Sequence, residues 1–394
     1  MDFYKRALEL RGETTAHRRY LHENAEAGMK LPKSTAYVRE QLSAMGIEAR
    51  ACGEGVTAAL GNGGRTILLR ADMDALPMRE ESGLPFACPT GEAAHCCGHD
   101  LHTAMLLTAA KLLKEREHTL RGTVRLMFQT GEEVFGGAEN MIAHGILENP
   151  RPDAALAFHV GAGKMPVGLY MYNDSDAAMM FSVDAFSITA HGKGTHGAYP
   201  HMGIDPIHIA AQLHLALTSL TAREGDPTHA CALTIGSLHA GSAPNIIPDT
   251  AELQGTLRTN NRQSREKLAA RVCQITEELA AAYGGEAQAV FSSRVPPLYC
   301  APEITREMAG YIEEMNVPNL QGHGGVTASA SEDFALVAER IPSTFIYLSA
   351  GYSDERGEYP AHNAKVQFNE DVLPFGAAAY AHCAARYLEE HDRK

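Results

Sequence analysis

Two short stretches of the chain bring together side chains that bind metal ions. Cys97-Gly98-His99 places a thiol two residues from an imidazole, and Glu132 and Glu133 follow Gly131 as adjacent carboxylates. Thiolate, imidazole and carboxylate groups are all ligands of zinc and related divalent metals. Adjacent carboxylates raise each other's pKa unless a cation lies between them. A metal would therefore bind one glutamate and leave the other available as a base.

Further candidate ligands lie elsewhere in the chain. His159 follows the apolar residues 154–158, and His362 lies in the loop sequence Pro360-Ala361-His362-Asn363. Asp72 and Asp74 are two residues apart, so their side chains share a face if the strand before them continues. One of them could orient a histidine that binds the metal. Taken singly, each of these residues is also typical of a packed core or of a surface loop.

Cys97 has competing interpretations. It fits a buried free thiol with a histidine packed beside it, and it fits a nucleophile whose base is a histidine. Together with Cys96 it also fits a structural zinc site. The residues around Cys97 do not by themselves choose between these roles and a catalytic metal site.

Polar residues in the middle of the chain could bind a substrate. The glycine-rich stretch 192–201 contains His196, which could donate a hydrogen bond to an oxyanion. Asn245 and Arg258 lie further along, and an arginine suits a bidentate contact with a carboxylate. We therefore expect Asn245 and Arg258 to hold an anionic group of the substrate. Each of the three also fits a turn or a strand end.

Apolar strands separated by helices must position these residues. The expected order is strand 66–69, helix 103–114, strand 124–128, helix 136–144, strand 154–158, a helix from 331, strand 344–348 and helix 372–390. This alternation predicts an α/β fold with a mostly parallel sheet that is covered on both faces. Such sheets place their chemistry at the carboxyl ends of the strands.

The pattern changes between residues 181 and 294. Strands are expected at 181–190, 230–238, 252–259 and 287–292, with helices at 205–223 and from Ser264 to about 283. The order β-α-β-β-α-β is typical of a ferredoxin-like α+β domain. The sequence thus predicts a catalytic domain of residues 1–180 and 295–394, interrupted by an inserted domain of residues 181–294.

Composition excludes several classes of function. The chain has 394 residues and a formal net charge of −14, which argues against a nucleic-acid partner. No apolar run is long enough to cross a bilayer, and the first residues lack the apolar core of a signal peptide. We therefore expect a cytoplasmic protein without a membrane partner, whose eight cysteines are mostly free thiols.

The motifs occur together in an order that resembles the M20 metallopeptidase family. They are Asp72-Met73-Asp74-Ala75-Leu76-Pro77, Cys97-Gly98-His99-Asp100, Gly131-Glu132-Glu133, His159, Gly194-Thr195-His196, Asn245-Ile246-Ile247-Pro248-Asp249 and Pro360-Ala361-His362-Asn363. More narrowly, the chain is similar to the amidohydrolase branch, which includes hippurate hydrolases, N-acyl-amino-acid amidohydrolases and plant auxin-conjugate hydrolases. The resemblance covers residues 5 to 390.

The resemblance implies roles for the individual residues. It implies a metallopeptidase catalytic domain that binds two divalent metal ions through Cys97, His99, Glu133, His159 and His362. It also implies that Glu132 is the general base, that Asp74 orients a ligand, and that His196, Asn245 and Arg258 contact the substrate from a lid. Leu101 departs from the glycine that is common in the branch, which could change the substrate preference.

The expected function is metal-dependent hydrolysis of the amide bond of a small N-acyl amino acid. Manganese is the favoured metal, and zinc, cobalt or nickel also suit the ligands. The lid would also form a homodimer. The alternatives are a dipeptidase or N-acetyl-diaminopimelate deacetylase on the same scaffold, a cysteine-nucleophile amidase, and a non-catalytic protein that binds a metal or metabolite.

Overall fold

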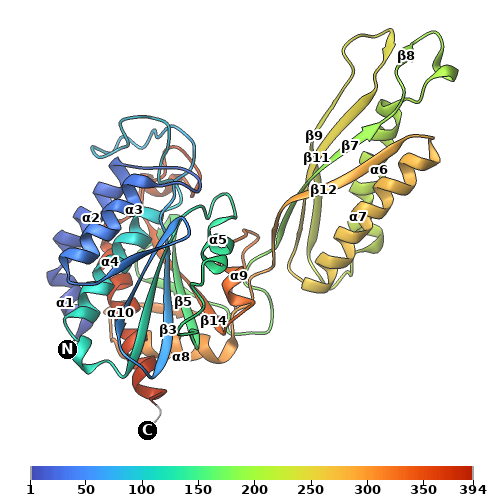
Figure 1. Ribbon diagram of the computed structural model, residues 1–394. Helices are drawn as coiled ribbons and strands as arrows, with labels where there is room; N and C mark the ends of the chain where they lie inside the picture. Colours follow the sequence, from blue (N-terminus) through green and yellow to red (C-terminus); the bar gives the residue numbers. More distant parts are fainter. Residues whose placement is uncertain (1, 393–394) are drawn as a thin grey trace. The chain divides into compact units, whose positions relative to one another are not determined.

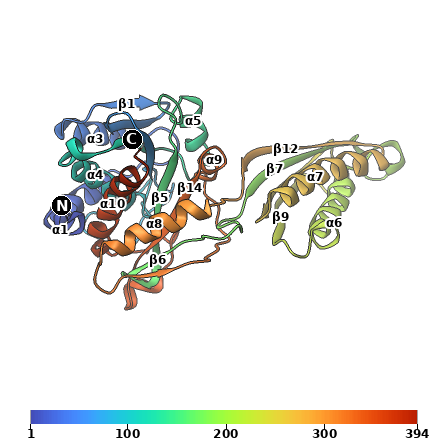
Figure 2. The same ribbon diagram turned by 90° about the horizontal axis from the view of Figure 1, so that it is seen from below.

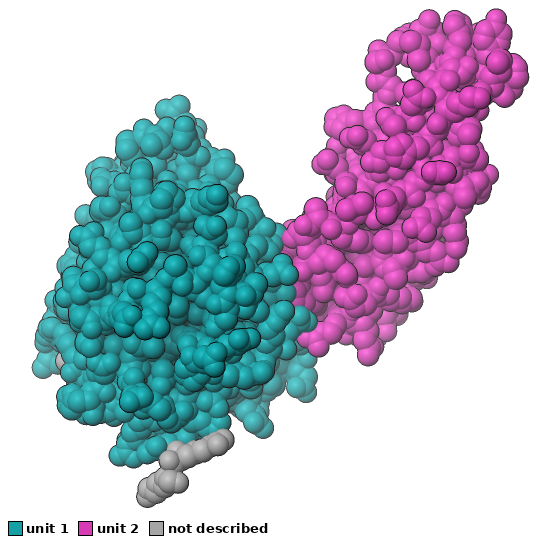
Figure 3. Space-filling view, viewed as in Figure 1, with its two compact units in different colours: residues 1–177, 299–327, 333–394 teal, residues 178–298, 328–332 magenta. Residues whose placement is uncertain are grey.

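The computed structural model describes residues 2–392, which divide into two compact units (Figure 3). Unit 1 comprises the chain up to Ala177, Tyr299–Thr327 and the chain from Asp333 onward. Unit 2 comprises Ala178–Leu298 and Ala328–Glu332. The short segment Ala328–Glu332, which the sequence pattern assigned to the catalytic domain, thus groups with the inserted residues. Each unit has its own hydrophobic core.

A mixed sheet with a parallel centre runs through unit 1 (Figure 1). Its strands among the described residues are β1 (Ala49–Cys52), β2 (Gly55–Gly61), β3 (Arg65–Asp72), β4 (Gly122–Gln129), β5 (Ala154–Pro166), β6 (Leu169–Met171), β13 (Gln321–His323) and β14 (Ser343–Gly351). They are ordered β1-β2-β4-β3-β5-β14-β6-β13. The central strands β4, β3, β5 and β14 run parallel, whereas β2 and β6 pair antiparallel with their neighbours β4 and β14. The predicted α/β class with a mostly parallel sheet is confirmed.

Helices of unit 1 lie on both sides of this sheet (Figure 2). Their bounds are α1 (Phe3–Glu9), α2 (Arg11–Glu23), α3 (Pro32–Ala44), α4 (His99–Lys114), α5 (Gly137–Ala143), α8 (Pro302–Glu314), α9 (Ala335–Ala338) and α10 (Leu373–Glu390). Helix α4 packs against β3, α2 and α10, and nearly all of its residues are buried. This burial fixes the start of α4 rigidly beside the ends of the central strands.

The local structure differs from the sequence expectation at three places that bear on function. β5 continues past His159 to Pro166, so His159 lies within a strand and not at its end. α4 begins at His99 and not at Thr103, because Gly98 adopts a left-handed conformation with φ 90° that leads directly into the helix. Helix α8 was not predicted, although Pro302 at its first position and the apolar residues of one face are typical of a helix start.

Unit 2 consists of a four-stranded antiparallel sheet with helices packed on it. Its elements within the described part of the chain include β7 (Val183–His191), α6 (Pro206–Glu224), β9 (Cys231–Ala240), β11 (Thr250–Thr259), α7 (Arg262–Ala282) and β12 (Glu286–Val295). The sheet order β12-β7-β11-β9 and the β-α-β-β-α-β connectivity are ferredoxin-like, as predicted. α7 begins at Arg262 and not at Ser264, because the Asn261 side chain accepts the Ser264 N–H and caps the helix.

Two further observations concern the whole described chain. Within residues 2–392, no helix combines the length and apolar character needed to cross a membrane. The same part of the chain contains all eight cysteines, and none of them forms a disulfide. This agrees with the expectation from the cysteine content.

Candidate metal centre and active site

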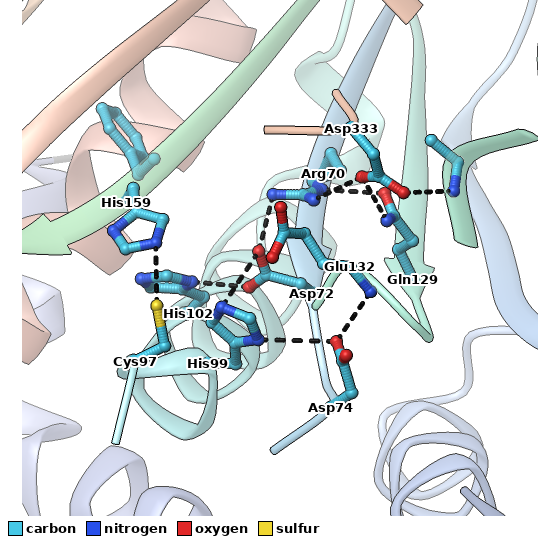
Figure 4. A network of polar contacts seen from close by, with 12 residues as sticks. Arg70, Asp72, Asp74, Cys97, His99, His102, Gln129, Glu132, His159 and Asp333 are labelled. Carbon is cyan, nitrogen blue, oxygen red and sulfur yellow. Dashed lines mark hydrogen bonds and ion pairs between the residues drawn. The ribbon is translucent and has the colours of Figure 1, made fainter. Parts of the chain in front are cut away.

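Side chains from separate parts of unit 1 meet beside the ends of the parallel strands (Figure 4). Cys97 precedes α4, and His99 is its first residue. Glu133 follows β4, and His159 lies within β5. His362 lies in the loop after β14, where its backbone N–H donates to the Cys96 carbonyl at 2.8 Å. The five predicted metal ligands are therefore brought together although 265 residues separate the first from the last.

The distances between these side chains match those between ligands of one metal ion. Cys97 Sγ lies 3.5 Å from His159 Nε2 and 3.3 Å from His362 Nε2. Glu133 Oε1 lies 3.4 Å from His362 Nε2 and 3.9 Å from His99 Nε2. Two ligand atoms bound tetrahedrally with bonds of about 2.0–2.3 Å are separated by roughly 3.5 Å. The geometry therefore suits a bound cation.

The ligands form two groups that share a single sulfur. In one group, Cys97, His99 and His159 each offer a ligand atom, and these atoms lie within 4.8 Å of one another. In the other group, Cys97, Glu133 and His362 meet the same limit. This arrangement could hold two cations side by side with Cys97 common to both.

Buried polar atoms at the centre fit a cation. Both ring nitrogens of His99 and the Oε1 atom of Glu133 are buried and have no hydrogen-bond partner among the described residues. A buried polar group without a partner destabilises a protein by about 1–3 kcal/mol. A bound metal ion would satisfy His99 Nε2 and Glu133 Oε1, and the mixed sulfur, nitrogen and oxygen donors suit a divalent transition metal.

Burial and neighbouring charges shift the pKa values of several candidate ligands. Burial raises the pKa of the Cys97 thiol to about 12, and a bound cation would lower this pKa and stabilise the thiolate. Burial holds the pKa of His159 well below its ordinary value, which keeps the ring neutral and able to bind a metal. For Glu133, burial opposes ionisation, but His362 and His99 outweigh it and lower the pKa of the carboxyl.

Asp74 contacts Glu132, Glu133 and His99 and fixes their relative positions. Its Oδ1 accepts the Glu132 N–H and its Oδ2 accepts the Glu133 N–H, both at 3.0 Å. The Oδ1 atom also lies 3.4 Å from His99 Nδ1, which leaves His99 Nε2 on the side of Glu133. Asp74 is buried, so this clamp is shielded from solvent. Carboxylates that orient a ligating histidine commonly tune metal affinity.

Glu132 lies beside the ligand groups but is not part of the two that share Cys97. A carboxylate oxygen of Glu132 lies within 4.8 Å of ligand atoms of His99 and Glu133. The side chain is buried, and Figure 4 shows it above His99, near Asp72 and Arg70. The two adjacent glutamates thus occupy different positions relative to the ligands.

Replacing Asp74 by asparagine should weaken metal binding by about 10–100-fold, because an amide cannot accept both backbone N–H groups. Competition with a chromogenic chelator measures this affinity. The matched control is Asp153→Asn at the opposite end of β3, where the carboxylate accepts the Thr66 N–H at 2.9 Å. Unchanged affinity in the Asp74 variant, or an equal loss in both variants, would contradict the role assigned to Asp74.

The predicted substrate-binding residues lie in unit 2. His196 belongs to β8 (Thr195–His196), which pairs with β10 (Ile246–Ile247), so His196 and Asn245 share one exposed ribbon. The Asn245 carbonyl accepts the Gly197 N–H at 2.8 Å. Arg258 lies on β11, and its Nη1 donates to Ser331 Oγ at 3.0 Å. Substrate contact by these three residues stays a prediction.

Leu101 does not lie at the site. Its side chain is fully buried in the hydrophobic core of unit 1. We therefore expect Leu101 to affect packing, in contrast to the change of substrate preference that the sequence suggested.

Sequence reasoning missed a set of buried polar residues behind the ligands (Figure 4). Arg70, His102, Gln129 and Asp333 are all fully buried and connect to Asp72 by hydrogen bonds. Asp72 therefore pairs with Arg70 and His102. The sequence could have indicated two of these residues, because Arg70 lies two residues before Asp72 and His102 lies three residues after His99.

Comparisons with known proteins agree with this geometry. The model of the peptidase family M20/M25/M40 matches residues 68–386. Thermostable carboxypeptidase 2 of Saccharolobus solfataricus is 35% identical over 382 residues, covering 94% of each chain. N-acetyl-L-cysteine deacetylase of Bacillus subtilis is 34% identical, covering 95% of this chain and 88% of that protein. Hippurate hydrolase of Campylobacter jejuni is 33% identical, covering 99% of this chain and 100% of that protein.

Solved structures share the same architecture. The Bacillus subtilis YXEP protein, described as a dinuclear metal-binding peptidase of the M20 family, superposes with a TM-score of 0.80. It is 29% identical in sequence, and the match covers 97% of this chain and 99% of that one. The similarity thus extends over both units and includes a protein described as binding two metals.

Proposed function

The chain belongs to the peptidase family M20/M25/M40, and from this premise we propose that it is a metal-dependent amidohydrolase of N-acyl amino acids. The observation that carries the proposal is the position of Glu132 beside the ligand groups and outside the two that share Cys97. A hydrolase needs a base in addition to its metal ligands. A protein that only binds a metal or a metabolite has no such need.

The relatives indicate the class of substrate. Hippurate hydrolase and N-acetyl-L-cysteine deacetylase are both named for removing an acyl group from an amino acid. The substrate proposed for this chain is likewise a small N-acyl amino acid. Its scissile bond is the amide between the acyl carbonyl and the amino nitrogen.

The mechanism follows from the positions of the residues. When bound, two divalent ions would polarise the acyl carbonyl and lower the pKa of a nearby water. Glu132 would take a proton from the attacking water at its carboxylate and pass it to the nitrogen of the leaving amine. Asp74 would keep Glu132 in place for both transfers through its hydrogen bond to the Glu132 N–H. The proposed ligands are Cys97, His99, Glu133, His159 and His362.

Unit 2 would complete the site as a lid. We propose that His196 donates a hydrogen bond to the oxyanion and that Asn245 and Arg258 hold the carboxylate of the substrate. A homodimer formed through this unit and a cytoplasmic location are part of the same proposal. Manganese is the proposed metal, and zinc, cobalt and nickel also match the donor atoms.

Hydrolysis of peptides is the second candidate function. The similarity to thermostable carboxypeptidase 2 supports it, because that protein is named for cleaving peptides. A dipeptidase and an N-acetyl-diaminopimelate deacetylase would use the same metal ligands and base. Substrate preference, and not the metal centre, separates these possibilities.

Treatment with a chelator should abolish hydrolysis, and added manganese should restore it. The measurement compares kcat/KM on N-acetyl and N-benzoyl amino acids, N-acetyl-diaminopimelate and unblocked dipeptides, before and after chelation. We expect N-acyl amino acids to be cleaved best. Faster cleavage of dipeptides would favour the second candidate, and turnover that resists chelation but stops after thiol alkylation would support a cysteine nucleophile.

A further inference from the structure

A chain of buried hydrogen bonds starts at Arg70 and runs behind the metal ligands (Figure 4). Arg70 Nη1 donates to Asp72 Oδ2 at 2.7 Å, and Asp72 Oδ1 lies 2.6 Å from His102 Nδ1. Arg70 is held on its other side by Gln129 Oε1 at 3.0 Å and by Asp333 Oδ1 at 3.3 Å. The mechanism above uses none of these contacts, although all five side chains are fully buried.

The second ring nitrogen of His102 binds the backbone of β5. The Val160 N–H donates to His102 Nε2 at 2.8 Å. A ring nitrogen that accepts a hydrogen bond carries no proton, so the proton of His102 is on Nδ1 and is donated to Asp72. Both ring nitrogens of His102 therefore form hydrogen bonds. His102 is thus not a metal ligand, even though it lies on the same helix as His99.

The backbone of Val160 also orients His159. The Val160 carbonyl accepts a hydrogen bond from His159 Nδ1 at 2.9 Å, so Nε2 is the atom that faces Cys97 Sγ, 3.5 Å away. One residue, Val160, therefore contacts His102 through its N–H and His159 through its carbonyl. Any shift of this segment would move the Nε2 atom of His159.

On the side of β5 that faces β3, α4 holds the Val160 segment because β3 does not reach it, whereas on the other side Val160 pairs with Leu348 of β14. The pairing of β3 with β5 ends at Ala157, and His102 then takes the Val160 N–H. Gly98 packs so closely on this segment that an added Cβ would lie 2.3 Å from Val160 Cγ2. The start of α4 thus fixes β5 by both a hydrogen bond and a close backbone approach.

We propose that His102, held by Asp72, is a positioning residue that fixes the Val160 segment and thereby directs His159 Nε2 toward the metal site. The inference deepens the proposed function and rests on it. The order of contacts is Arg70, Asp72, His102, Val160 and His159. Groups that orient a ligating histidine commonly change metal affinity by about 10–100-fold, which sets the size of the expected effect.

Three variants on one helix test the proposal. His102→Ala removes both contacts, whereas His102→Gln keeps an amide donor for Asp72 and an oxygen acceptor for the Val160 N–H. Thr108→Val is the matched control, because it removes a buried hydrogen bond to Thr14 on the same helix, away from the ligands. The readouts are the dissociation constants for Zn²⁺ and Co²⁺ and the visible spectrum of the cobalt-loaded protein.

We expect His102→Ala to bind the ions about 10–100-fold more weakly and to alter the cobalt spectrum. His102→Gln and Thr108→Val should stay close to the wild type in both readouts. Wild-type affinity and spectrum in His102→Ala would overturn the proposal, and so would an equal loss in all three variants. A wild-type protein that binds neither ion would instead overturn the metal centre on which the proposal rests.

Discussion

Replacing Glu132 by glutamine should lower kcat on the best N-acyl amino acid by about 10²–10⁴-fold, the usual contribution of a general base. Glutamine has nearly the same shape and keeps the backbone N–H that donates to Asp74. Its amide cannot accept a proton from water, so only the chemical step should suffer. Steady-state kinetics with metal-saturated protein measures the change, and KM should change much less than kcat.

Glu139→Gln is the matched control for this experiment. It makes the same chemical change seven residues later, at an exposed position in the first turn of α5. This variant should keep wild-type kcat. Full activity of Glu132→Gln on every substrate cleaved by the wild type would remove Glu132 from the mechanism, and equal losses in both variants would point to general damage.

Replacing Cys97 by alanine should remove metal from both sites together. Cys97 Sγ belongs to both ligand groups and lies 3.5 Å from His159 Nε2 and 3.3 Å from His362 Nε2. Loss of a residue that only supports a ligand costs about 10–100-fold in affinity, so loss of a shared ligand should exceed about 100-fold. The measurement is metal content after dialysis, together with turnover.

The neighbouring cysteine provides the control for Cys97. Cys96 is also buried, but its side chain belongs to the hydrophobic core of unit 1. Its carbonyl, which accepts the His362 N–H, survives substitution by alanine. Cys96→Ala should therefore keep its metal. Two ions per chain in Cys97→Ala, or metal loss in Cys96→Ala, would contradict the shared-sulfur arrangement and would favour a site built on Cys96.

Much of the fold was accessible from the sequence because buried strands and amphipathic helices carry strong local patterns. The apolar stretch before Glu132 predicted β4, and the pattern after residue 181 predicted the ferredoxin-like β-α-β-β-α-β order of elements. The end of β5 was not accessible, because the residues after His159 are less apolar and are held in the sheet by β14. Pairing with a distant strand overrides the local pattern there.

The sequence motifs identified the candidate ligands, but only the structure gives the distances between them and the residues that hold them in place. Cys97 and His362 are 265 residues apart, and no local pattern places their atoms within 3.3 Å. The role of His102 was hidden for a similar reason. Its partner is a backbone N–H 58 residues away, which carries no side-chain signature in the sequence.

The central claim is that Glu133 binds metal and that Glu132 acts on the water. Metal content per chain and turnover should therefore be measured side by side for the wild type, Glu132→Gln and Glu133→Gln after the same metal loading and dialysis. We predict that the wild type and Glu132→Gln retain the same amount of metal, that Glu133→Gln retains less, and that only the wild type turns over substrate rapidly. Equal loss of metal in the two variants, or rapid turnover by Glu132→Gln, would contradict the account.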